Sequence, residues 1–327
     1  MKVLVIGGTL FIGRALVTEL VKAGHDVTVL HRRAQHDLGS VGRKQIGNLM
    51  ADRNDPAQIR AALAGQKFEV VFDNVYDWER GTTAAQVEAT ALAAGDSLQR
   101  YVFVSSVAAY GAGLNHYEGD GLAGEDHADA YVRNKANSER VLFRLHQRYG
   151  LPAVTLRPPY IYGPGNPFHR ESFFWERFRD GRKIIIPGDG RRLMQFVYVK
   201  DLVAAAMAAM ETPAAVGHAF NVASPKAITQ VETVQALADA AGKKGVELVK
   251  VSREELLKAG GHPMGPKLYF GFYFDLPPIT MLVTKAQRVL KFKPTEFQAG
   301  LKETYKAWKA ISGTLPAPDY SYEDSVL

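Results

Sequence analysis

The stretch that decides the fold is "KVLVIGGTLFIGRALVTELVKAGH", residues 2–25. Its opening apolar run predicts a buried strand, and after a glycine-rich turn the apolar residues recur at helical spacing up to Gly24. A strand, a glycine turn and a helix in this order are typical of a sheet that binds a dinucleotide, because the helix N-terminus can hold a pyrophosphate. The turn consists of Gly7, Gly8, Thr9, Leu10, Phe11, Ile12 and Gly13.

The middle of this turn departs from the commonest spacing, Gly-x-x-Gly-x-x-Gly, because it holds Leu10. Gly7 permits the tight turn after the strand, and Gly13 lets the helix and the strand pack closely. The position of Leu10 governs how closely the backbone approaches a pyrophosphate, so its side chain has to point away from the phosphates. The turn predicts a cofactor site, and a tight corner of the sheet is the alternative.

The first half of the chain continues this alternation of strands and helices. Further strands are expected at 26–32, 68–74, 100–106, 152–158 and 218–224, and further helices at 55–66, about 82–94 and about 130–149. The pattern predicts an α/β fold, a doubly wound parallel Rossmann sheet with a smaller, mostly helical C-terminal substrate lobe. We expect a dinucleotide-binding domain over 1–165, rejoined by about 195–225, and a substrate-binding lobe formed by 166–194 and 226–327.

Composition excludes several classes of protein. The 327 residues include no cysteine, which excludes disulfides, thiolate metal sites and cysteine catalysis. The nine histidines show no metal-binding spacing, so we expect no metal site. Apolar runs are too short to span a bilayer, and the first strand begins directly after Met1, so we expect a soluble, cytoplasmic protein without a membrane partner. The formal charge of +6 is spread in pairs of basic residues rather than in a nucleic-acid tail.

The end of the second strand indicates which dinucleotide would bind. A carboxylate there usually bonds the adenosine ribose of NAD, whereas arginines accommodate the 2′-phosphate of NADP. This chain has His31, Arg32 and Arg33 at that point and no acid. Guanidinium groups pair with phosphate through forked, charge-assisted hydrogen bonds. The sequence therefore favours NADP(H) over NAD(H), with a solvent-exposed basic loop as the alternative.

A tyrosine and a lysine four residues apart are the candidate catalytic pair. In "AYVRNK", Tyr131 and Lys135 share one face of the helix expected at about 130–149. A nearby ammonium stabilises phenolate and lowers the tyrosine pKa from about 10, so that Tyr131 can exchange a proton with a substrate hydroxyl while hydride moves. Tyr305 and Lys309 have the same spacing, but nothing else of the kind surrounds them.

The context of the first pair supports this choice. The strand before it ends in Ser105 and Ser106, and the carboxyl end of a parallel strand faces the ligand. A serine there can hydrogen-bond the substrate oxygen. The alternatives are a packing role for Tyr131 and a strand-end hydrogen bond for Ser106. Asp73, Asn74 and Tyr76 follow another strand at the same edge, where they line the pocket or, for Asp73, cap a turn.

Five motifs in order carry a resemblance that covers nearly the whole chain: "GGTLFIG", "SSVAAYG", "YVRNK", "RPPYIYGPG" and "VYVKDL". Together they resemble an extended short-chain dehydrogenase/reductase, the NAD(P)-dependent epimerase/dehydratase family. The resemblance implies a catalytic triad of Ser106, Tyr131 and Lys135. It also implies that many members dimerise through the helices expected at about 82–94 and 130–149. We expect a homodimer on this ground.

The resemblance also implies further site residues. Asp52 and Arg53 would lie near the adenine, and the backbone of Pro159, Tyr160 and Ile161 would lie beside the nicotinamide. The remaining candidates at the cofactor are Asn74, Ser105, Tyr131 and Lys135, with Lys135 holding the nicotinamide ribose. Those at the substrate are Tyr76, Ser106, Tyr162, Arg191 and Gln195.

Two departures from the family pattern bear on the substrate. Sugar-nucleotide epimerases usually carry an arginine at the position of Met194, and methionine cannot neutralise a diphosphate, although Arg191 or Arg192 could substitute. Second, "GGTLFIG", "YIYGP", "VKDL" and "DYSYEDSVL" are similar to the chloroplast stem-loop-binding proteins and their bacterial relatives. That branch includes members described as RNA-binding, in which the catalytic tyrosine can be lost. Both Tyr131 and Lys135 are present here, which favours redox chemistry.

These observations together predict an NAD(P)-dependent epimerase/dehydratase-type oxidoreductase. It would transfer hydride at a carbinol or carbonyl carbon of a small substrate, with a sugar-like compound among the candidates and Tyr131 as general acid/base. Two alternatives stay open. One is an RNA-binding protein on the same scaffold, which is less favoured, and the other is a redox sensor that binds the cofactor without turnover.

Overall fold

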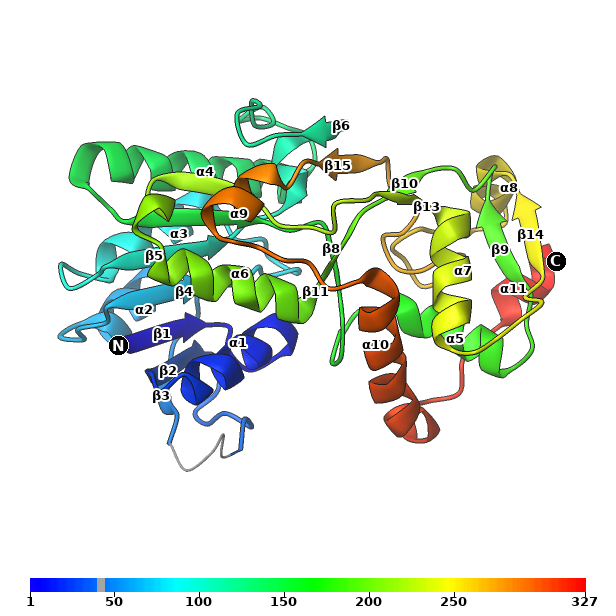
Figure 1. Cartoon of the computed structure of the whole chain (residues 1–327), viewed down its shortest axis with the longest axis horizontal. Coiled ribbons are helices and arrows are strands. Elements are labelled where there is room, and N and C mark those ends of the chain that lie inside the picture. Colours follow the sequence, from blue (N-terminus) through cyan, green and yellow to red (C-terminus); the bar gives the residue numbers. More distant parts are fainter. Residues whose placement is uncertain (40–44) are drawn as a thin grey trace. The chain divides into compact units, whose positions relative to one another are not determined.

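The computed structural model describes residues 1–39 and 45–327 and divides the chain into two compact units (Figure 1). Unit 1 consists of Met1–Pro159, Val199–Ala223 and Met281–Lys293. Unit 2 consists of Tyr160–Tyr198, Ser224–Thr280 and Pro294–Leu327.

Unit 1 is built on a seven-stranded parallel sheet, which confirms the predicted doubly wound Rossmann fold. In spatial order its strands are β12 (His218–Asn221), β7 (Ala153–Arg157), β5 (Arg100–Val104), β4 (Val70–Asp73), β1 (Lys2–Ile6), β2 (Asp26–His31) and β3 (Gly47–Met50). The chain order reverses between β1 and β4, and ligands bind at such a switch point, beyond the carboxyl ends of the strands. The edge strand β3 was not predicted, because its four residues form no continuous apolar run.

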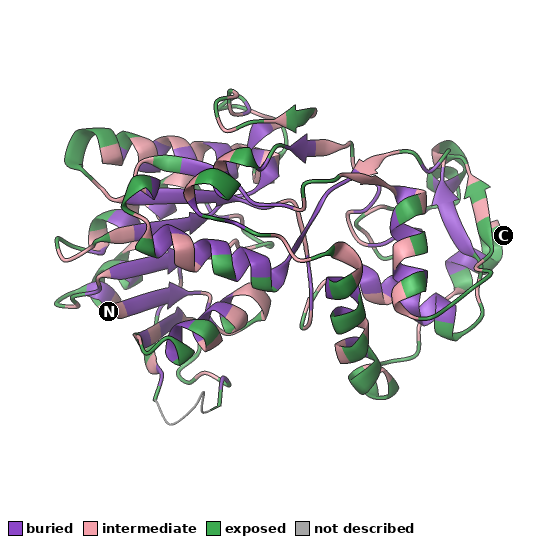
Figure 2. Ribbon diagram, viewed as in Figure 1, coloured by how far each residue is buried: buried purple, intermediate pink, exposed green. Residues whose placement is uncertain are grey.

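Helices cover both faces of this sheet (Figure 1). They are α1 (Phe11–Lys22), α2 (Pro56–Leu63), α3 (Ala84–Ala93), α4 (Ala130–Tyr149), α6 (Val199–Glu211) and α9 (Thr284–Val289), with the short 3₁₀ turns η1 (Val107–Tyr110) and η2 (Pro213–Ala215) and the strand β6 (Gly113–His116). The central strands of the sheet are buried almost throughout, whereas the edge strand β3 is only partly buried (Figure 2). One core cluster joins Leu4 and Tyr101 of the sheet to Ile59, Val87 and Leu142 of α2, α3 and α4.

Helix α4 begins and ends at residues suited to those positions. The Asp129 carboxylate accepts hydrogen bonds from the backbone N–H groups of Tyr131, at 2.8 Å, and Val132, at 3.1 Å. This N-cap satisfies donors that a helix otherwise leaves unpaired, and it fixes the first turn, where Tyr131 lies. Gly150 ends the helix at φ 71°, a left-handed conformation that glycine adopts without strain.

Unit 2 joins helices to short pairs of strands. The parallel pairs are β8 (Tyr160–Tyr162) with β11 (Phe196–Tyr198) and β9 (Ile184–Pro187) with β14 (Leu248–Val251), and β10 (Leu193–Met194) runs antiparallel to β13 (Ile228–Thr229). The helical segments are α5 (Glu171–Arg179), α7 (Gln230–Ala240), α8 (Arg253–Lys258), α10 (Phe297–Ile311), η3 (Ser312–Thr314) and α11 (Ser321–Val326). Strand β15 (Ile279–Met281) spans a boundary between the units.

The observed division differs from the expected one in two respects. The boundaries fall after Pro159, Tyr198 and Ala223 rather than at 165, 195 and 225. In addition, residues 281–293, which were expected in the C-terminal lobe, belong to unit 1. They do so because α9 packs against the sheet strand β12, with Ala286 and Leu290 buried. The sequence of residues 281–293 has no pattern that distinguishes it from the neighbouring helical segments of unit 2.

Candidate active site

The glycine turn keeps the geometry of a dinucleotide-binding turn. Gly7 has φ 81°, and a Cβ on Gly13 would lie 1.9 Å from the Gly7 carbonyl oxygen, so helix and strand approach too closely for a side chain there. Leu10, the N-cap of α1, is 60% exposed, so most of its side chain lies outside the packed turn. Phe11 has φ 41°, a left-handed conformation that strains a non-glycine residue and is common at ligand sites. Thr9 accepts a hydrogen bond from Arg14 Nε through its carbonyl, and Ile12 is half-buried.

An unsatisfied amide lies beside this turn. Asn74 follows β4, and its Nδ2 lies 3.5 Å from the Gly7 carbonyl oxygen. Its Oδ1 is buried and has no hydrogen-bond partner among the described residues. An unpaired buried acceptor costs about 1–3 kcal/mol, so the site suits a ligand that brings a donor to this atom. The glycine turn and Asn74 therefore fit a dinucleotide.

The basic residues after β2 lie near the same edge of the sheet. His31 Nε2 lies 2.6 Å from Asn48 Oδ1, and the backbone N–H of Arg33 donates to His31 Nδ1. The Arg32 side chain is 67% exposed, and its guanidinium is 3.9 Å from the Asp77 carboxylate. Asp77 therefore lies beside the basic cluster, although it is far from Arg32 in the sequence.

Arg53 is a buried cross-link rather than a surface group. Its guanidinium pairs with the Asp73 carboxylate through Nε at 3.2 Å and Nη2 at 2.5 Å, and Nη1 donates to the Thr90 hydroxyl. Asp73 also accepts from the Tyr101 hydroxyl. Asp73 thus belongs to this buried network. The Arg53 side chain is engaged there too, and the location of Asp52 and Arg53 near the adenine stays a prediction. Asp52, which precedes it, pairs with Arg80 at 2.8 Å.

Lys135 and Tyr131 lie together on α4, as their spacing requires. The Lys135 Nζ donates to the Val104 carbonyl at the end of β5, at 2.7 Å. It lies 5.9 Å from the centroid of the Tyr131 ring, 5.6 Å from that of Tyr76 and 4.8 Å from that of Phe103. Burial lowers the pKa of Lys135 to about 8, against the opposing effect of the Asp73 and Glu139 carboxylates. A desolvated cation is thus held beside a phenol.

The two serines after β5 have different partners. The Ser106 hydroxyl oxygen accepts from the Ala108 N–H at 3.2 Å and caps η1. Because the oxygen acts as an acceptor, its own O–H stays available as a donor. The Ser105 hydroxyl instead donates to Glu139 at 2.5 Å, and Glu139 also pairs with Arg157 at 2.7 Å. Ser105 therefore belongs to a buried network joining β5, α4 and β7, and its contact with the cofactor stays a prediction.

Sequence reasoning missed one aromatic residue of this site. The Trp78 ring stacks on Tyr131 with a centroid separation of 5.0 Å and an interplanar angle of 21°. Tyr76 meets Tyr131 edge-on at 4.8 Å, and its hydroxyl accepts from Asn134 Nδ2 at 3.2 Å. The available signal was the cluster of aromatic and polar residues in "DNVYDWERG", which directly follows a strand at the ligand edge.

The other expected residues lie mostly in unit 2. Pro159 closes a segment of unit 1, whereas Tyr160, Ile161, Tyr162, Arg191 and Gln195 belong to unit 2. Gln195 and Tyr162 are about 1% exposed, and Gln195 donates to the Ser224 carbonyl, so both contribute to packing. Tyr160 donates to the Tyr273 carbonyl at 2.8 Å. Arg191 is exposed.

The position that carries an arginine in sugar-nucleotide epimerases is apolar and buried in this structure. Met194 is 2% exposed, and its sulfur lies 3.6 Å from the Thr233 hydroxyl. The neighbouring Arg192 pairs with the buried Asp275 carboxylate at 3.1 Å. Arg253 pairs with the same carboxylate at 2.7 Å. The charge of Arg192 is therefore already partly neutralised inside unit 2.

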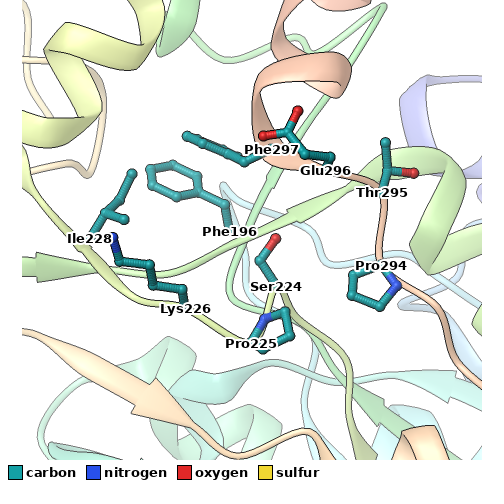
Figure 3. A pocket seen from close by; sticks show the side chains of 9 residues that line it. All are labelled: Phe196, Ser224, Pro225, Lys226, Ile228, Pro294, Thr295, Glu296 and Phe297. Atoms are coloured by element: carbon teal, nitrogen blue, oxygen red, sulfur yellow. The ribbon is translucent and has the colours of Figure 1, made fainter.

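Unit 2 also contains a pocket of about 240 Å³ (Figure 3). It is lined by Phe196, Ser224, Pro225, Lys226, Ile228, Pro294, Thr295, Glu296 and Phe297. The rings of Phe196 and Phe297 lie 5.1 Å apart and form one of its walls. None of the residues expected at the substrate lines this pocket.

Two kinds of feature, a membrane-spanning helix and a metal-binding cluster, are absent from residues 1–39 and 45–327. Among these residues no helix is long and apolar enough to cross a membrane. Nor do three or more His, Cys, Asp or Glu side chains there gather in a way that could hold a metal ion.

Known proteins with similar sequences or similar folds include enzymes and a binding protein. A full-length relative is the chloroplast stem-loop binding protein of 41 kDa b of Arabidopsis thaliana, with 30% identity over 100% of this chain and 84% of that protein. The 2-alkyl-3-oxoalkanoate reductase of Stenotrophomonas maltophilia is 28% identical over 76% of this chain and 78% of its own length. Among solved structures, dTDP-glucose 4,6-dehydratase of Bacillus anthracis in complex with NAD superposes with a TM-score of 0.77, at 18% identity, over 95% of this chain and 97% of that one.

The sequence model of the NAD dependent epimerase/dehydratase family matches residues 3–223, which include the glycine turn, Ser106, Tyr131 and Lys135. The likeness to the dehydratase structure shows the fold alone, whereas the family match covers more than half of the chain. The chain therefore belongs to the NAD dependent epimerase/dehydratase family, the extended short-chain dehydrogenases/reductases, and is an NAD(P)-dependent enzyme of that type.

Proposed function

We propose that this enzyme acts at a carbonyl or carbinol carbon of a small substrate, with Tyr131 as the general acid/base. The observation that carries the proposal is the buried Lys135 ammonium, fixed on the Val104 carbonyl and lying 5.9 Å from the Tyr131 ring centroid. A positive charge in a poorly hydrated site stabilises a phenolate more strongly than the same charge in water. Tyr131 can then lose a proton and recover it as the substrate oxygen changes its charge.

Ser106 complements this pair by orienting the substrate oxygen. The Ser106 oxygen is held by the Ala108 N–H, so its hydroxyl hydrogen can point at a substrate carbonyl. The bound nicotinamide cofactor would supply or accept hydride at the carbon of that carbonyl. The residues of the chain itself position the oxygen and move the proton, and both reduction and epimerisation are compatible with these roles.

The cofactor we propose is NADP(H). The glycine turn and Asn74 would hold the dinucleotide, and the exposed Arg32 and Arg33 would meet a 2′-phosphate. Arg32 would have to exchange its 3.9 Å contact with Asp77 for this phosphate, and an arginine–phosphate pair is the stronger of the two when it is bidentate. The backbone of Pro159, Tyr160 and Ile161 beside the nicotinamide stays a prediction.

For the substrate, we propose a compound that carries no diphosphate. Met194 is buried and Arg192 is engaged by Asp275, so of the three positions only the exposed Arg191 remains, and one guanidinium does not balance the charge of a diphosphate. A relative named for the reduction of 2-alkyl-3-oxoalkanoates makes non-nucleotide ketones one class to test, and small sugars are another.

We also propose a homodimer formed through α3 and α4, in the cytoplasm. Leu92 on α3 is 59% exposed, and a hollow of about 170 Å³ lies over both helices, lined by Ala84, Ala85, Glu88, Glu125, Asn137, Arg140, Val141 and Arg144. The exposed leucine and the hollow beside it are the features that support a contact here, together with the family expectation for these two helices. Analytical ultracentrifugation of the wild type and Leu92→Glu would show a dimer and a monomer, respectively.

An RNA-binding role is the second candidate, and the full-length relative named as a stem-loop binding protein favours it. Electrostatic binding weakens steeply with added salt. RNA affinity measured at two ionic strengths, with and without NADPH, would separate a specific site from general attraction to a chain of formal charge +6. The third candidate is a redox sensor that binds the cofactor without turnover. It requires that Tyr131→Phe keep every activity that can be measured for the wild type.

The decisive test of catalysis compares two tyrosines of equal spacing. NADPH oxidation is measured with a panel of 3-oxoalkanoates, ketones and keto sugars. Tyr131→Phe should lower kcat by about 100-fold or more, because general acid/base groups contribute about 10²–10⁴-fold, while NADPH affinity changes little. Tyr305→Phe is the matched control, because its ring packs on Trp175 and Trp308 and phenylalanine preserves that packing. Equal activity of both variants would refute the proposed role of Tyr131.

A further inference from the structure

The segment between β4 and α3 carries two aromatic rings to the proposed general acid. The Trp78 ring is nearly parallel to the Tyr131 ring, at 21° and 5.0 Å between centroids. Tyr76 meets Tyr131 at 87° and 4.8 Å, and it meets Trp78 at 67° and 5.1 Å. Aromatic pairs in these stacked and edge-on arrangements contribute about 0.5–1.5 kcal/mol beyond their buried area. The three rings therefore form one packed group.

This segment is held by its own hydrogen bonds. The Asp77 carboxylate accepts from the backbone N–H groups of Glu79 and Arg80 and from Arg80 Nε, at 2.9–3.0 Å. Arg80 also pairs with Asp52 at 2.8 Å. In addition, Asn54 Nδ2 donates to the Gly81 carbonyl. Trp78 thus lies in a segment whose backbone is held by hydrogen bonds on both sides of it.

Tyr76 is tied to the helix that carries the phenol. Its hydroxyl accepts from Asn134 Nδ2 at 3.2 Å, and Asn134 lies directly before Lys135 on α4. Tyr76 and Lys135 also approach each other, with Nζ 5.6 Å from the ring centroid. One side of Tyr131 is therefore fixed by Tyr76 and Lys135.

Trp78 covers a different part of the phenol and is itself 52% exposed. In this structure one face of the indole covers Tyr131. A general acid must lie within hydrogen-bond reach of the atom that it protonates, and small misplacements of such a group reduce the rate strongly.

We propose that Trp78 is a positioning residue for Tyr131. The indole confines the phenol ring to one plane and limits the access of water to it, whereas Tyr76 and Lys135 fix the ring from other sides. The catalytic significance of this role rests on the proposed function of Tyr131. The stacking and the shielding can be measured without any substrate.

The first measurement reads the stacking by fluorescence. The emission of Trp78 is the difference between the wild type and Trp78→Phe, because Trp175 and Trp308 are buried and common to both. As the pH rises, ionised Tyr131 should quench the stacked indole by energy transfer. Tyr131→Phe should abolish this transition, whereas Tyr149→Phe, which removes a 74% exposed tyrosine from the same helix, should preserve it.

The second measurement reads the shielding. The rate of O-acetylation of Tyr131 by N-acetylimidazole, followed by peptide mass spectrometry, should rise severalfold in Trp78→Ala and return towards the wild-type rate in Trp78→Phe. The rate at Tyr149 in the same samples is the internal control. Thermal unfolding of each variant shows whether it is folded.

The outcomes separate the two claims. If Trp78→Ala is folded and leaves the Tyr131 acetylation rate as in the wild type, and if Tyr131→Phe leaves the pH-dependent quenching of Trp78 unchanged, Trp78 does not position the phenol. If the stacking and shielding are observed but Tyr131→Phe retains full turnover, the proposed function fails, whereas the packing of Trp78 on Tyr131 stands.

Discussion

Lys135 is buried although it carries a charge, and this burial lowers the stability of the folded protein. The ammonium is 5% exposed and has one hydrogen bond, to the Val104 carbonyl. Desolvation disfavours the charged form, which is why the pKa falls from 10.5 to about 8. In the folded state the lysine is thus harder to protonate than in the unfolded chain. A charge held at this disadvantage is typical of functional sites.

Replacing this lysine should therefore stabilise the protein. Below pH 8 the wild type bears the full penalty of the buried charge, and between about pH 8 and pH 10.5 the unfolded chain binds more protons, so the free energy of unfolding rises with pH. Lys135→Met should raise the free energy of unfolding at pH 7 by on the order of 1–3 kcal/mol, and the gain should shrink towards pH 10.5. Urea unfolding at several pH values measures both effects.

The control for this prediction is Lys309→Met, at an exposed lysine that also follows a tyrosine by four residues. It should change stability little at any pH. A loss of stability in Lys135→Met at pH 7, or a difference from the wild type that does not vary with pH, would contradict the burial argument.

At the scale of the elements, the join between β1 and α1 depends on one contact. A Cβ on Gly13 would lie 1.9 Å from the Gly7 carbonyl oxygen and 2.8 Å from Gly8 Cα, so only glycine allows the helix to approach the turn. Leu10 in the same turn is exposed and has no such restriction. Gly7 and Gly13 are therefore required for the turn. The position between them that is glycine in the commonest spacing accepts the side chain of Leu10.

Two substitutions test this difference. Gly13→Ala should lower the midpoint of thermal unfolding and abolish NADPH binding, because backbone atoms face the new methyl group and have to move. Leu10→Ala should leave both quantities close to the wild type. Fluorimetric unfolding and a calorimetric NADPH titration give the two readings. Tight binding by Gly13→Ala would show that the turn is not the cofactor site.

The elements also show what the sequence can predict. The sheet strands other than β3 contain apolar runs, so the sequence pattern predicts them. Strands β3 and β6 were missed because they have no such run. The pairing of Tyr131 with Lys135 follows from helical spacing. Trp78 reaches Tyr131 from a loop, and no spacing rule links the two residues. The roles of Arg53 and Ser105 are set by Asp73 and Glu139, which lie 20 and 34 residues further along the chain.

For the whole molecule, the sequence does not predict the strand pairs of unit 2 or the points where the chain passes back from one unit to the other. Strand pairs such as β9 with β14 join segments far apart in the sequence, which local patterns do not reveal. The return of residues 281–293 to unit 1 has the same cause. Family membership rests on residues 3–223, which contain the turn, the serine, the tyrosine and the lysine of unit 1 and also residues 160–198 of unit 2.

Uptake of a pyridine nucleotide is required by both the enzyme and the redox sensor, whereas a purely RNA-binding role does not require it. The most direct measurement is isothermal titration calorimetry of the full chain with NADPH and with NADH. We predict saturable binding of one nucleotide per chain, tighter for NADPH than for NADH, with the preference reduced in Arg32→Ala. The absence of binding heat for both nucleotides, together with unchanged thermal unfolding in their presence, would contradict the account.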